Sequence, residues 1–386
     1  MKPLKSAGVF ALIVIFVFVL AVNGMSFNAE AISAKSYALI ELSSERVIEA
    51  GNENQRLPMA STTKIMTALI AVESGKLNET FSVPPEAVIV EGSSMGLKAD
   101  EKITLRELVC GLMLESGNDA ANAIAIILGG SISHFADMMN SRAQTLGLSN
   151  THFCNPSGLD NPDHYTTALD LARLAAYAMK NKDFAQIVGT KKMRISYDGI
   201  KNARLLFNHN RLLNSYPGEI GVKTGFTKKS GRCLVSCACR NGVTLVAVTL
   251  NDPNDWKDHT ALLDSGFSKL KNTPLLSSTP EITAKVVGGK ADTVETAYDK
   301  SVSAPLQSGE LDRVKMTVEL ERFYYAPIVN GQTLGHLVFT LDGKVIATSN
   351  IYASNSVSAT GIQIKNSSFF MRMFDNFTKL LRAMTF

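Results

Sequence analysis

The sequence has few cysteines and none of the common metal-binding motifs. Its 386 residues include five cysteines, an odd number and too few for a disulfide scaffold in a chain of this length. Neither C-x-x-C nor H-E-x-x-H occurs, and the six histidines have no ligand spacing, so we expect no zinc site. Even intervals separate Cys233, Cys237 and Cys239 along one predicted strand, so their side chains point to the same face. We expect them to be small buried side chains.

Neither sign of charge dominates the sequence. Lysine and arginine number 39, and aspartate and glutamate number 35, which gives a formal net charge of +4. Proteins that bind nucleic acid usually carry a basic patch or stripe. Here no long basic run occurs and basic residues are not interleaved with aromatic ones, so we expect no nucleic-acid partner.

No apolar run is long enough to span a membrane as a helix. The longest begins near the N-terminus, at Val9, and ends at Val22, which is short of the roughly 20 residues that a spanning helix needs. Lys2 and Lys5 precede this run, and the small-x-small sequence Ala29-Glu30-Ala31 follows it. This pattern predicts a secretory signal peptide over residues 1–31, removed by cleavage after Ala31.

The rest of the composition is that of a globular protein, with 45% hydrophobic and 19% charged residues and a length sufficient for two domains. Periodicity and turn signals predict strands at Tyr37–Leu42, Arg46–Ile48, Ile220–Thr227, Arg232–Cys239 and Val243–Leu250. They predict helices from Ser61 to Gly75, Thr104 to Leu114, Asp119 to Gly129, Ser133 to Leu146, Thr167 to Lys180 and Trp256 to Phe267. Asn272–Pro280 is predicted as a linker, and Ile282–Lys365 as a small all-β domain of short strands.

Ser61 and Lys64 form an S-x-x-K pattern at the start of a helix predicted to be mostly buried. Residues three apart lie on one helix face, so the hydroxyl and the amine can meet. A serine hydroxyl becomes a good nucleophile when a neighbouring base takes its proton, and a lysine amine can do so if burial lowers its pKa. Taken alone, the pattern is more often a helix cap followed by a surface lysine, so the S-x-x-K residues by themselves favour that structural interpretation.

Two other short motifs follow in the chain. Ser116-Gly117-Asn118 lies between two predicted buried helices, where it is either a capped turn or a hydroxyl and an amide held at a cleft. Lys223-Thr224-Gly225 lies on a predicted strand, where the lysine is either a solvated edge residue or part of a site. His152 is a lone histidine in a turn-rich loop, and we expect it to be a packed loop residue.

The three motifs in this order resemble the serine acyl-transferase set of penicillin-binding proteins and β-lactamases. Over nearly its whole length the chain is similar to the low-molecular-weight penicillin-binding proteins that are D-alanyl-D-alanine carboxypeptidases. The residues that carry the similarity are Ala60-Ser61-Thr62-Thr63-Lys64, Glu115-Ser116-Gly117-Asn118-Asp119-Ala120, Asn150-Thr151-His152-Phe153 with Gly158-Leu159, and Gly221-Val222-Lys223-Thr224-Gly225.

The resemblance implies a role for each motif. Ser61 would attack the terminal D-Ala-D-Ala bond with Lys64 as general base, and Ser116 would relay a proton to the leaving amine. Further residues would bind the substrate: Asn118 its backbone, Lys223 and Thr224 beside Gly225 its terminal carboxylate, and the N–H groups of Ser61 and Phe226 the oxyanion. The resemblance implies neither a metal nor an organic cofactor. Phe226 departs from relatives that carry a polar residue after K-T-G, which affects side-chain contacts but not the backbone donor.

The fold that the resemblance implies is α+β. It consists of a transpeptidase domain over residues 32–271, with an antiparallel sheet, flanking helices and a helical lobe, followed by a β-rich domain over residues 272–366. Residues 367–386 carry Phe369, Phe370, Phe374 and Phe377 at helical spacing among Arg372, Lys379 and Arg382. This pattern predicts an amphipathic helix on an anionic membrane surface, on the extracytoplasmic side, or a helix packed on its own β domain.

Three other functions remain open at this stage. A β-lactamase shares the motifs, but we find no counterpart between Ser116 and Lys223 of the glutamate that acts in deacylation in class A enzymes. A DD-endopeptidase that cuts peptidoglycan cross-links could use the same residues. An inactive wall-binding protein could keep the fold without the chemistry. The preferred prediction is a carboxypeptidase that acts on peptidoglycan stem pentapeptides and binds penicillin covalently.

Overall fold

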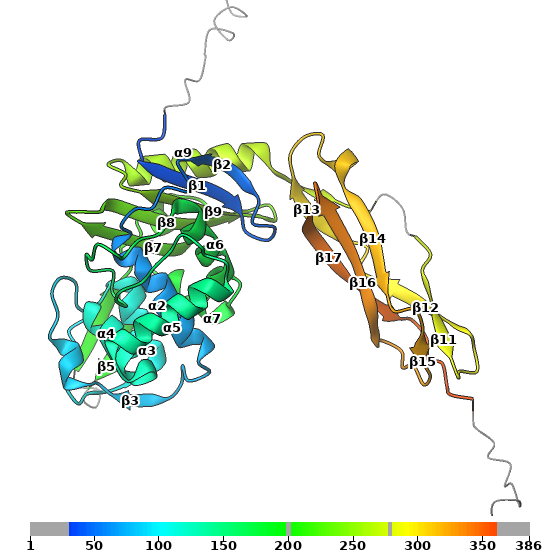
Figure 1. The fold of residues 1–386 in the computed structure, drawn as a ribbon, viewed down its shortest axis with the longest axis horizontal. Coiled ribbons are helices and arrows are strands. Elements are labelled where there is room, and N and C mark those ends of the chain that lie inside the picture. The colour runs from blue at the N-terminus through cyan, green and yellow to red at the C-terminus, as the bar shows by residue number, and fades with distance from the viewer. Residues whose placement is uncertain (1–30, 198–201, 277–279, 361–386) are drawn as a thin grey trace, which may run out of the picture.

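The computed structural model describes residues 31–197, 202–276 and 280–360. The predicted signal peptide, apart from Ala31, and the predicted C-terminal helix lie outside these residues. None of the helices within the described ranges is both long and apolar enough to cross a membrane. The described chain forms a larger N-terminal domain of sheet and helices and an elongated C-terminal domain of strands (Figure 1).

A five-stranded antiparallel sheet in the order β2-β1-β9-β8-β7 forms the centre of the N-terminal domain. Its strands are β1 (Ser36–Glu41), β2 (Val47–Gly51), β7 (Glu219–Thr227), β8 (Gly231–Arg240) and β9 (Val243–Leu250). The turn Asn241-Gly242 joins the last two strands with φ of +50° and +79°, as a type I′ hairpin requires. Strand β7 is one of the two edge strands of this sheet, and it carries the K-T-G motif.

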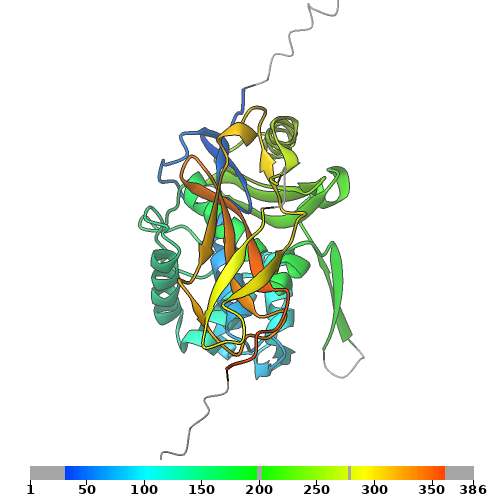
Figure 2. The same cartoon turned by 90° about the vertical axis from the view of Figure 1, so that its right-hand side faces the viewer.

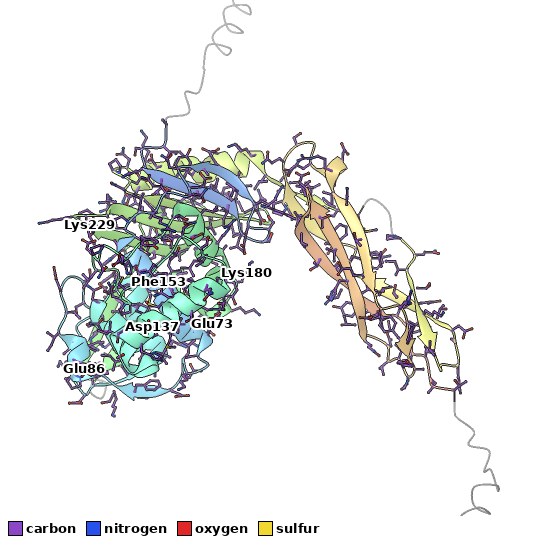
Figure 3. All side chains as sticks on the ribbon, viewed as in Figure 1. Glu73, Glu86, Asp137, Phe153, Lys180 and Lys229 are labelled. Carbon is purple, nitrogen blue, oxygen red and sulfur yellow. The ribbon has the colours of Figure 1, made fainter. Side chains whose placement is uncertain are left out.

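Helices cover both faces of the sheet (Figure 1). One face packs on α9 (Asp255–Lys269) through leucine and alanine side chains. The other packs on a helical lobe composed of α2 (Lys64–Glu73), α3 (Leu105–Leu114), α4 (Asn118–Gly129), α5 (Ile132–Thr145), α6 (Ala168–Met179) and α7 (Lys182–Val188). Figure 3 labels Phe153 between the sheet and the lobe, where its side chain is buried.

Smaller elements complete the domain. These are η1 (Ala60–Thr63), η2 (Pro85–Val88), α8 (Leu212–Ser215), the strand pair β3 (Thr80–Ser82) and β4 (Lys102–Thr104), and the hairpin of β5 (Lys192–Tyr197) and β6 (Asn202–Phe207). Figure 2 shows this hairpin standing out from the lobe. The sequence analysis did not predict it.

The C-terminal domain contains a six-stranded sheet in the order β14-β16-β17-β12-β11-β15 and a separate pair, β10 with β13. The strands are β10 (Lys271–Pro274), β11 (Thr283–Val287), β12 (Thr293–Tyr298), β13 (Ser303–Leu306), β14 (Lys315–Leu320), β15 (Tyr324–Tyr325), β16 (Thr333–Leu341) and β17 (Lys344–Ala353), with one short helix, η3 (Leu311–Arg313). The predicted all-β character is confirmed. The predicted linker Asn272–Pro280 is in part wrong, because Asn272–Pro274 belong to β10.

Local signals located most helices of the lobe to within one or two residues. Thr104 forms a capping box with Glu107, since each side chain accepts a hydrogen bond from the other residue's backbone N–H. The cysteine prediction holds for Cys233 and Cys237, which are buried on one face of β8, and is wrong for Cys239, which is exposed at the end of that strand. The cysteines form no disulfide.

Candidate active site

Ser61 lies in the turn η1, which runs directly into α2. The preceding residue, Ala60, has a φ of +48°, a conformation that is uncommon for a residue with a side chain and is often found at functional sites. The hydroxyl of Thr63 donates to the carbonyl of Ala60 at 2.8 Å and also contacts His164 Nε2 at 2.7 Å. The backbone around the serine is therefore held by a side chain of its own turn.

His164 connects this turn to the neighbouring loop. Burial lowers the pKa of His164 to about 4, so its imidazole is neutral at physiological pH. Its Nδ1 accepts the N–H of Cys154 at 3.0 Å, which leaves the proton on Nε2, facing the Thr63 hydroxyl. A chain of hydrogen bonds thus runs from Cys154 through His164 and Thr63 to the carbonyl beside Ser61.

Lys64 is fully buried, and its Nζ has three neighbours. It lies 2.9 Å from Ser61 Oγ, 2.7 Å from Asn118 Oδ1 and 2.6 Å from the carbonyl oxygen of Ser157. The amide and carbonyl oxygens can only accept, whereas the serine hydroxyl can also donate. A neutral amine has two N–H groups and one lone pair, so this arrangement aims the lone pair of Lys64 at the Ser61 proton.

The surroundings of Lys64 favour that neutral form. Burial lowers its pKa well below the ordinary value, and the positive charge of Lys223 lowers it further. Asp119 acts in the opposite direction. Because a base must be unprotonated to accept a proton, these effects suit Lys64 to activate the serine.

The loop that carries Ser157 approaches η1 very closely. Gly158 has a φ of +87°, and a Cβ at this position would lie 1.9 Å from the carbonyl oxygen of Ala60. Only glycine can therefore occupy the position without moving the loop. The close approach brings the Ser157 carbonyl to Lys64.

The S-G-N motif forms the turn between α3 and α4, as predicted. Ser116 has a φ of +61° and lines the same cavity as Ser61. Asn118 does not line this cavity in the described part of the chain. Its Oδ1 accepts from Lys64, and its Nδ2 donates to the carbonyl of Glu91 at 2.6 Å. The observed contacts of Asn118 therefore position Lys64, whereas a contact with substrate remains a prediction.

The K-T-G motif lies on β7, next to the serine. Lys223 and Gly225 face the helical lobe, since they pair with Val235 and Cys233, which belong to its core. A Cβ at Gly225 would lie 3.0 Å from the backbone nitrogen of Ser61, so glycine lets the strand approach the nucleophile. Lys223 is buried, its Nζ donates to the Thr224 carbonyl at 3.0 Å, and burial lowers its pKa to about 7.

A cavity of about 310 Å³ extends from Ser61 along β7. Thr224, Gly225 and Phe226 line it, and the Phe226 side chain is 64% exposed. Of the predicted site residues, the cavity unites Ser61, Ser116, Thr224, Gly225 and Phe226, while Lys64, Asn118 and Lys223 lie outside its lining. The turn η1, which carries Ser61, packs on β7, and α2 begins beside this strand (Figure 1).

The sequence analysis missed several residues that line the cavity. They are Ser93, His209, Arg211, Arg232, Asp255 and Trp256. Arg232 pairs with Asp255 at 3.0 Å, and His209 lies 3.5 Å from the carboxylate of Glu115. The guanidinium of Arg211 lies 5.9 Å from the ring centre of Trp256. The segment around Arg211 has no motif or periodic pattern that would have singled it out.

His152 does not line the cavity. Its Nδ1 contacts the carbonyl oxygen of Asp163 at 2.6 Å, and its backbone forms a bridge with Tyr165. The prediction of a packed loop residue is confirmed.

Comparison with known proteins agrees with this site. The family model described as D-alanyl-D-alanine carboxypeptidase matches residues 23–254, and the model described as penicillin-binding protein 5, C-terminal domain, matches residues 271–359. A D-alanyl-D-alanine carboxypeptidase of Bacillus subtilis, DacF, is 34% identical over 88% of this chain and 90% of its own length. One from Haemophilus influenzae, DacA, is 30% identical over 94% of this chain and 95% of its own.

Solved structures agree as well. Penicillin-binding protein 5 of Haemophilus influenzae has a TM-score of 0.63 at 29% identity, covering 85% of this chain and 98% of that one. The carboxypeptidase DacD of Francisella tularensis has a TM-score of 0.62 at 29% identity, covering 86% and 95%. The chain therefore belongs to the D-alanyl-D-alanine carboxypeptidase family of serine peptidases, the low-molecular-weight penicillin-binding proteins.

Proposed function

We propose that Ser61 is the nucleophile of this carboxypeptidase and that Lys64 is its general base. The observation that carries the proposal is the set of contacts of Lys64 Nζ, in which two oxygens that only accept leave its lone pair for the Ser61 hydroxyl at 2.9 Å. The lowered pKa of Lys64 supports the same role.

In the first half of the reaction, Ser61 Oγ bonds to the carbonyl carbon of the penultimate D-alanine while Lys64 takes the serine proton. The backbone N–H groups of Ser61 and Phe226 stabilise the oxyanion that forms. As the C–N bond breaks, the proton passes to the leaving amine with the help of Ser116, and D-alanine departs. The product is an ester of the shortened peptide with Ser61.

In the second half, water attacks this ester and Lys64 accepts a proton from it. Breakage of the bond to Ser61 Oγ then releases the peptide and returns a proton to the serine. A β-lactam acylates the same serine, but its leaving amine stays attached through the ring. Stem peptides and β-lactams are ligands of this family.

The free edge of β7 is suited to hold the substrate. An extended peptide can add to an exposed sheet edge through backbone hydrogen bonds. Thr224 would hydrogen-bond the terminal carboxylate, and the nearby charges of Lys223 and Arg211 would attract it.

The residues around the cavity favour a carboxypeptidase over a β-lactamase. No glutamate lines the cavity in the part of the chain that the structure describes, and its carboxylate, Asp255, is paired with Arg232. Water attack on the ester would therefore depend on Lys64.

The proposal includes an extracytoplasmic location, consistent with the cell-wall enzymes among the relatives. Residues 1–31 would be removed as a signal peptide, leaving a catalytic domain over 32–271 and a β domain over 272–366. Residues 367–386 would attach the chain to the membrane surface.

The test is mass spectrometry of the exported chain after penicillin treatment, together with D-alanine release from a pentapeptide. We expect an adduct on the Ser61 peptide, and we expect Ser61→Ala to lose both the adduct and activity by a factor on the order of 10⁴ or more. Ser82→Ala removes an exposed hydroxyl remote from the cavity and should change neither. Full activity in folded Ser61→Ala would refute the assignment.

A further inference from the structure

Strands β11 and β15 lie at the end of the C-terminal domain that is remote from the N-terminal domain (Figure 1), and four exposed apolar side chains belong to these strands or to the segments that adjoin them. They are Val287, Phe323, Tyr325 and Val329, with exposed fractions of 39%, 40%, 73% and 63%. We call these four residues the apolar tip. Single exposed apolar residues are ordinary, but a group of them usually marks a contact surface.

The backbone of the domain holds the apolar tip in place. Strands β11 and β15 pair in parallel with Val287 opposite Tyr325. The rings of Phe323 and Tyr325 are edge to face, with centres 5.3 Å apart. Ile328 is bridged to Val357, which holds the neighbouring Val329 at the same end. The tip is therefore formed before it meets a partner, so little ordering entropy is lost on contact.

The described chain ends directly beside the apolar tip. Thr360 donates to the carbonyl of Gly288 through its backbone N–H and its hydroxyl, both at 2.8 Å. Gly288 immediately follows Val287. Between Thr360 and the predicted amphipathic helix 367–386 lie only residues 361–366, which can span at most about 25 Å. A surface bound by that helix must therefore lie close to the tip.

The side chains of the tip fit a lipid surface better than a protein. Tyrosine and phenylalanine pack well at the headgroup level of a bilayer, and Lys285, Lys290 and Arg322 are exposed around them. Asp292 and Glu321 are also exposed there, so apolar contact rather than charge would dominate. Four partly exposed side chains cover far less than the roughly 1,200 Å² of a stable protein interface.

We propose that the apolar tip inserts into the headgroup region of an anionic bilayer next to the C-terminal helix. This inference rests on the proposed function, in which residues 367–386 bind the membrane surface. The helix raises the effective concentration of the tip at the bilayer, so a weak contact suffices. Attachment at two points restricts the tilt of the β domain. Strand β17, which has ten residues, spans about 33 Å, and the domain would therefore hold the active site at a defined height.

A tryptophan reporter tests the proposal in the exported chain from residue 32 to 386. The chain has one tryptophan, Trp256, which lies in the N-terminal domain, so the unmutated chain is the blank. Tyr325→Trp is mixed with vesicles of brominated phosphatidylcholine and phosphatidylglycerol in equal amounts. We expect the added fluorescence to be quenched by half or more, because the bromine atoms quench only tryptophans in the bilayer.

Val345→Trp is the matched control. Val345 is 51% exposed on β17 and lies close to the hairpin turn at Asp342. That turn is near η3, because Arg313 of η3 pairs with Asp342. Its fluorescence should be unchanged. The double variant Phe323→Ser/Tyr325→Ser should weaken vesicle binding about tenfold while leaving penicillin acylation intact.

Each other outcome overturns a distinct claim. If the chain sediments with vesicles but Tyr325→Trp is not quenched, the tip does not meet the bilayer, although the helix anchor stands; a C-terminal segment folded over the tip would give this result. If both reporters are quenched equally, the domain lies flat and the tip has no special role. If the chain does not sediment, the helix anchor and the tip contact both fail.

Discussion

Lys223 lowers the pKa of Lys64 although the two lysines belong to different elements, β7 and α2. Both side chains are fully buried or nearly so, and burial is the main reason why the pKa of each lysine is lowered. The second lysine therefore has two effects in the site. In the proposed mechanism it would supply positive charge near the substrate carboxylate, and by lowering the pKa of Lys64 it would help keep the proposed base unprotonated.

Replacing Lys223 by glutamine should separate these effects. Without the positive charge, the pKa of Lys64 rises, so Lys64 keeps its proton to a higher pH and the acid limb of the pH profile of penicillin acylation moves upward. The rate should also fall because the carboxylate loses an ion-pair partner. The measurement is the second-order acylation rate across pH.

Lys229→Gln is the control, since this lysine is exposed at the turn after the same strand (Figure 3). Lys229→Gln should leave the pH profile of penicillin acylation unchanged. A slower Lys223→Gln enzyme with an unmoved acid limb would mean that the lysine only binds substrate.

Glu219 predicts a pH dependence of stability. It lies at the start of β7, where Asn210 Nδ2 donates to one carboxyl oxygen at 2.9 Å and the other is buried with no partner in the described chain. Burial raises its pKa from 4.5 to about 8. Between these values the folded state binds more protons than the unfolded one, so the contribution of Glu219 is present below pH 4.5 and is lost as pH rises through 8.

Glu219→Gln keeps the shape and the accepting oxygen but cannot ionise. Relative to the unmutated chain, the variant should therefore gain stability as pH rises, by up to a few kcal/mol above pH 8. Urea unfolding at about pH 5 and above pH 8 measures the difference. Glu321→Gln, at an exposed glutamate, should give no such trend, and an equal trend in both variants would contradict the role of burial.

Arg211 should contribute to substrate affinity. Its guanidinium lies over Trp256 in the cavity and forms no ion pair with an acidic residue within the described ranges. Its charge is therefore available to a carboxylate. Arg211→Gln should raise KM for a pentapeptide about tenfold or more with a smaller change in kcat. Arg240→Gln is the control, because Arg240 also lies over an aromatic ring but outside this cavity. An unchanged KM in Arg211→Gln would exclude the contact.

The motif residues could be predicted because each has a local pattern. Ser61 and Lys64 are three residues apart on one helical turn, and the K-T-G residues follow each other on one strand. The hydrogen-bond partners of Lys64 Nζ were harder to predict. The carbonyl of Ser157 carries no side-chain signal, and its approach depends on the fold around Gly158. Arg211 and Trp256 meet only because the chain folds α8 and α9 beside the cavity.

Arg46 and Glu310 tie the two domains together. Arg46 Nη1 donates to both carboxylate oxygens of Glu310 at 2.9 and 3.0 Å, and Nη2 donates to the carbonyl of Pro305 at 2.7 Å. Both side chains are only 11% exposed, so solvent screens the pair less than a surface salt bridge. No sequence pattern pointed to this contact.

A double-mutant cycle tests this connection. Arg46→Ala leaves Glu310 with the backbone N–H of Gln307 and a 3.6 Å contact to Arg313, so we expect a loss of about 1–3 kcal/mol in stability. Glu310→Ala should lose a similar amount, and the double variant less than the sum, because the second change no longer strands a partly buried charge. Arg313→Ala, which removes the more exposed partner, should cost little. Additive losses would mean that the pair does not couple the domains. D-Alanine release from a short peptide should be unchanged throughout, since none of these residues lines the cavity, whereas small-angle scattering of Arg46→Ala should show a broader range of domain separations.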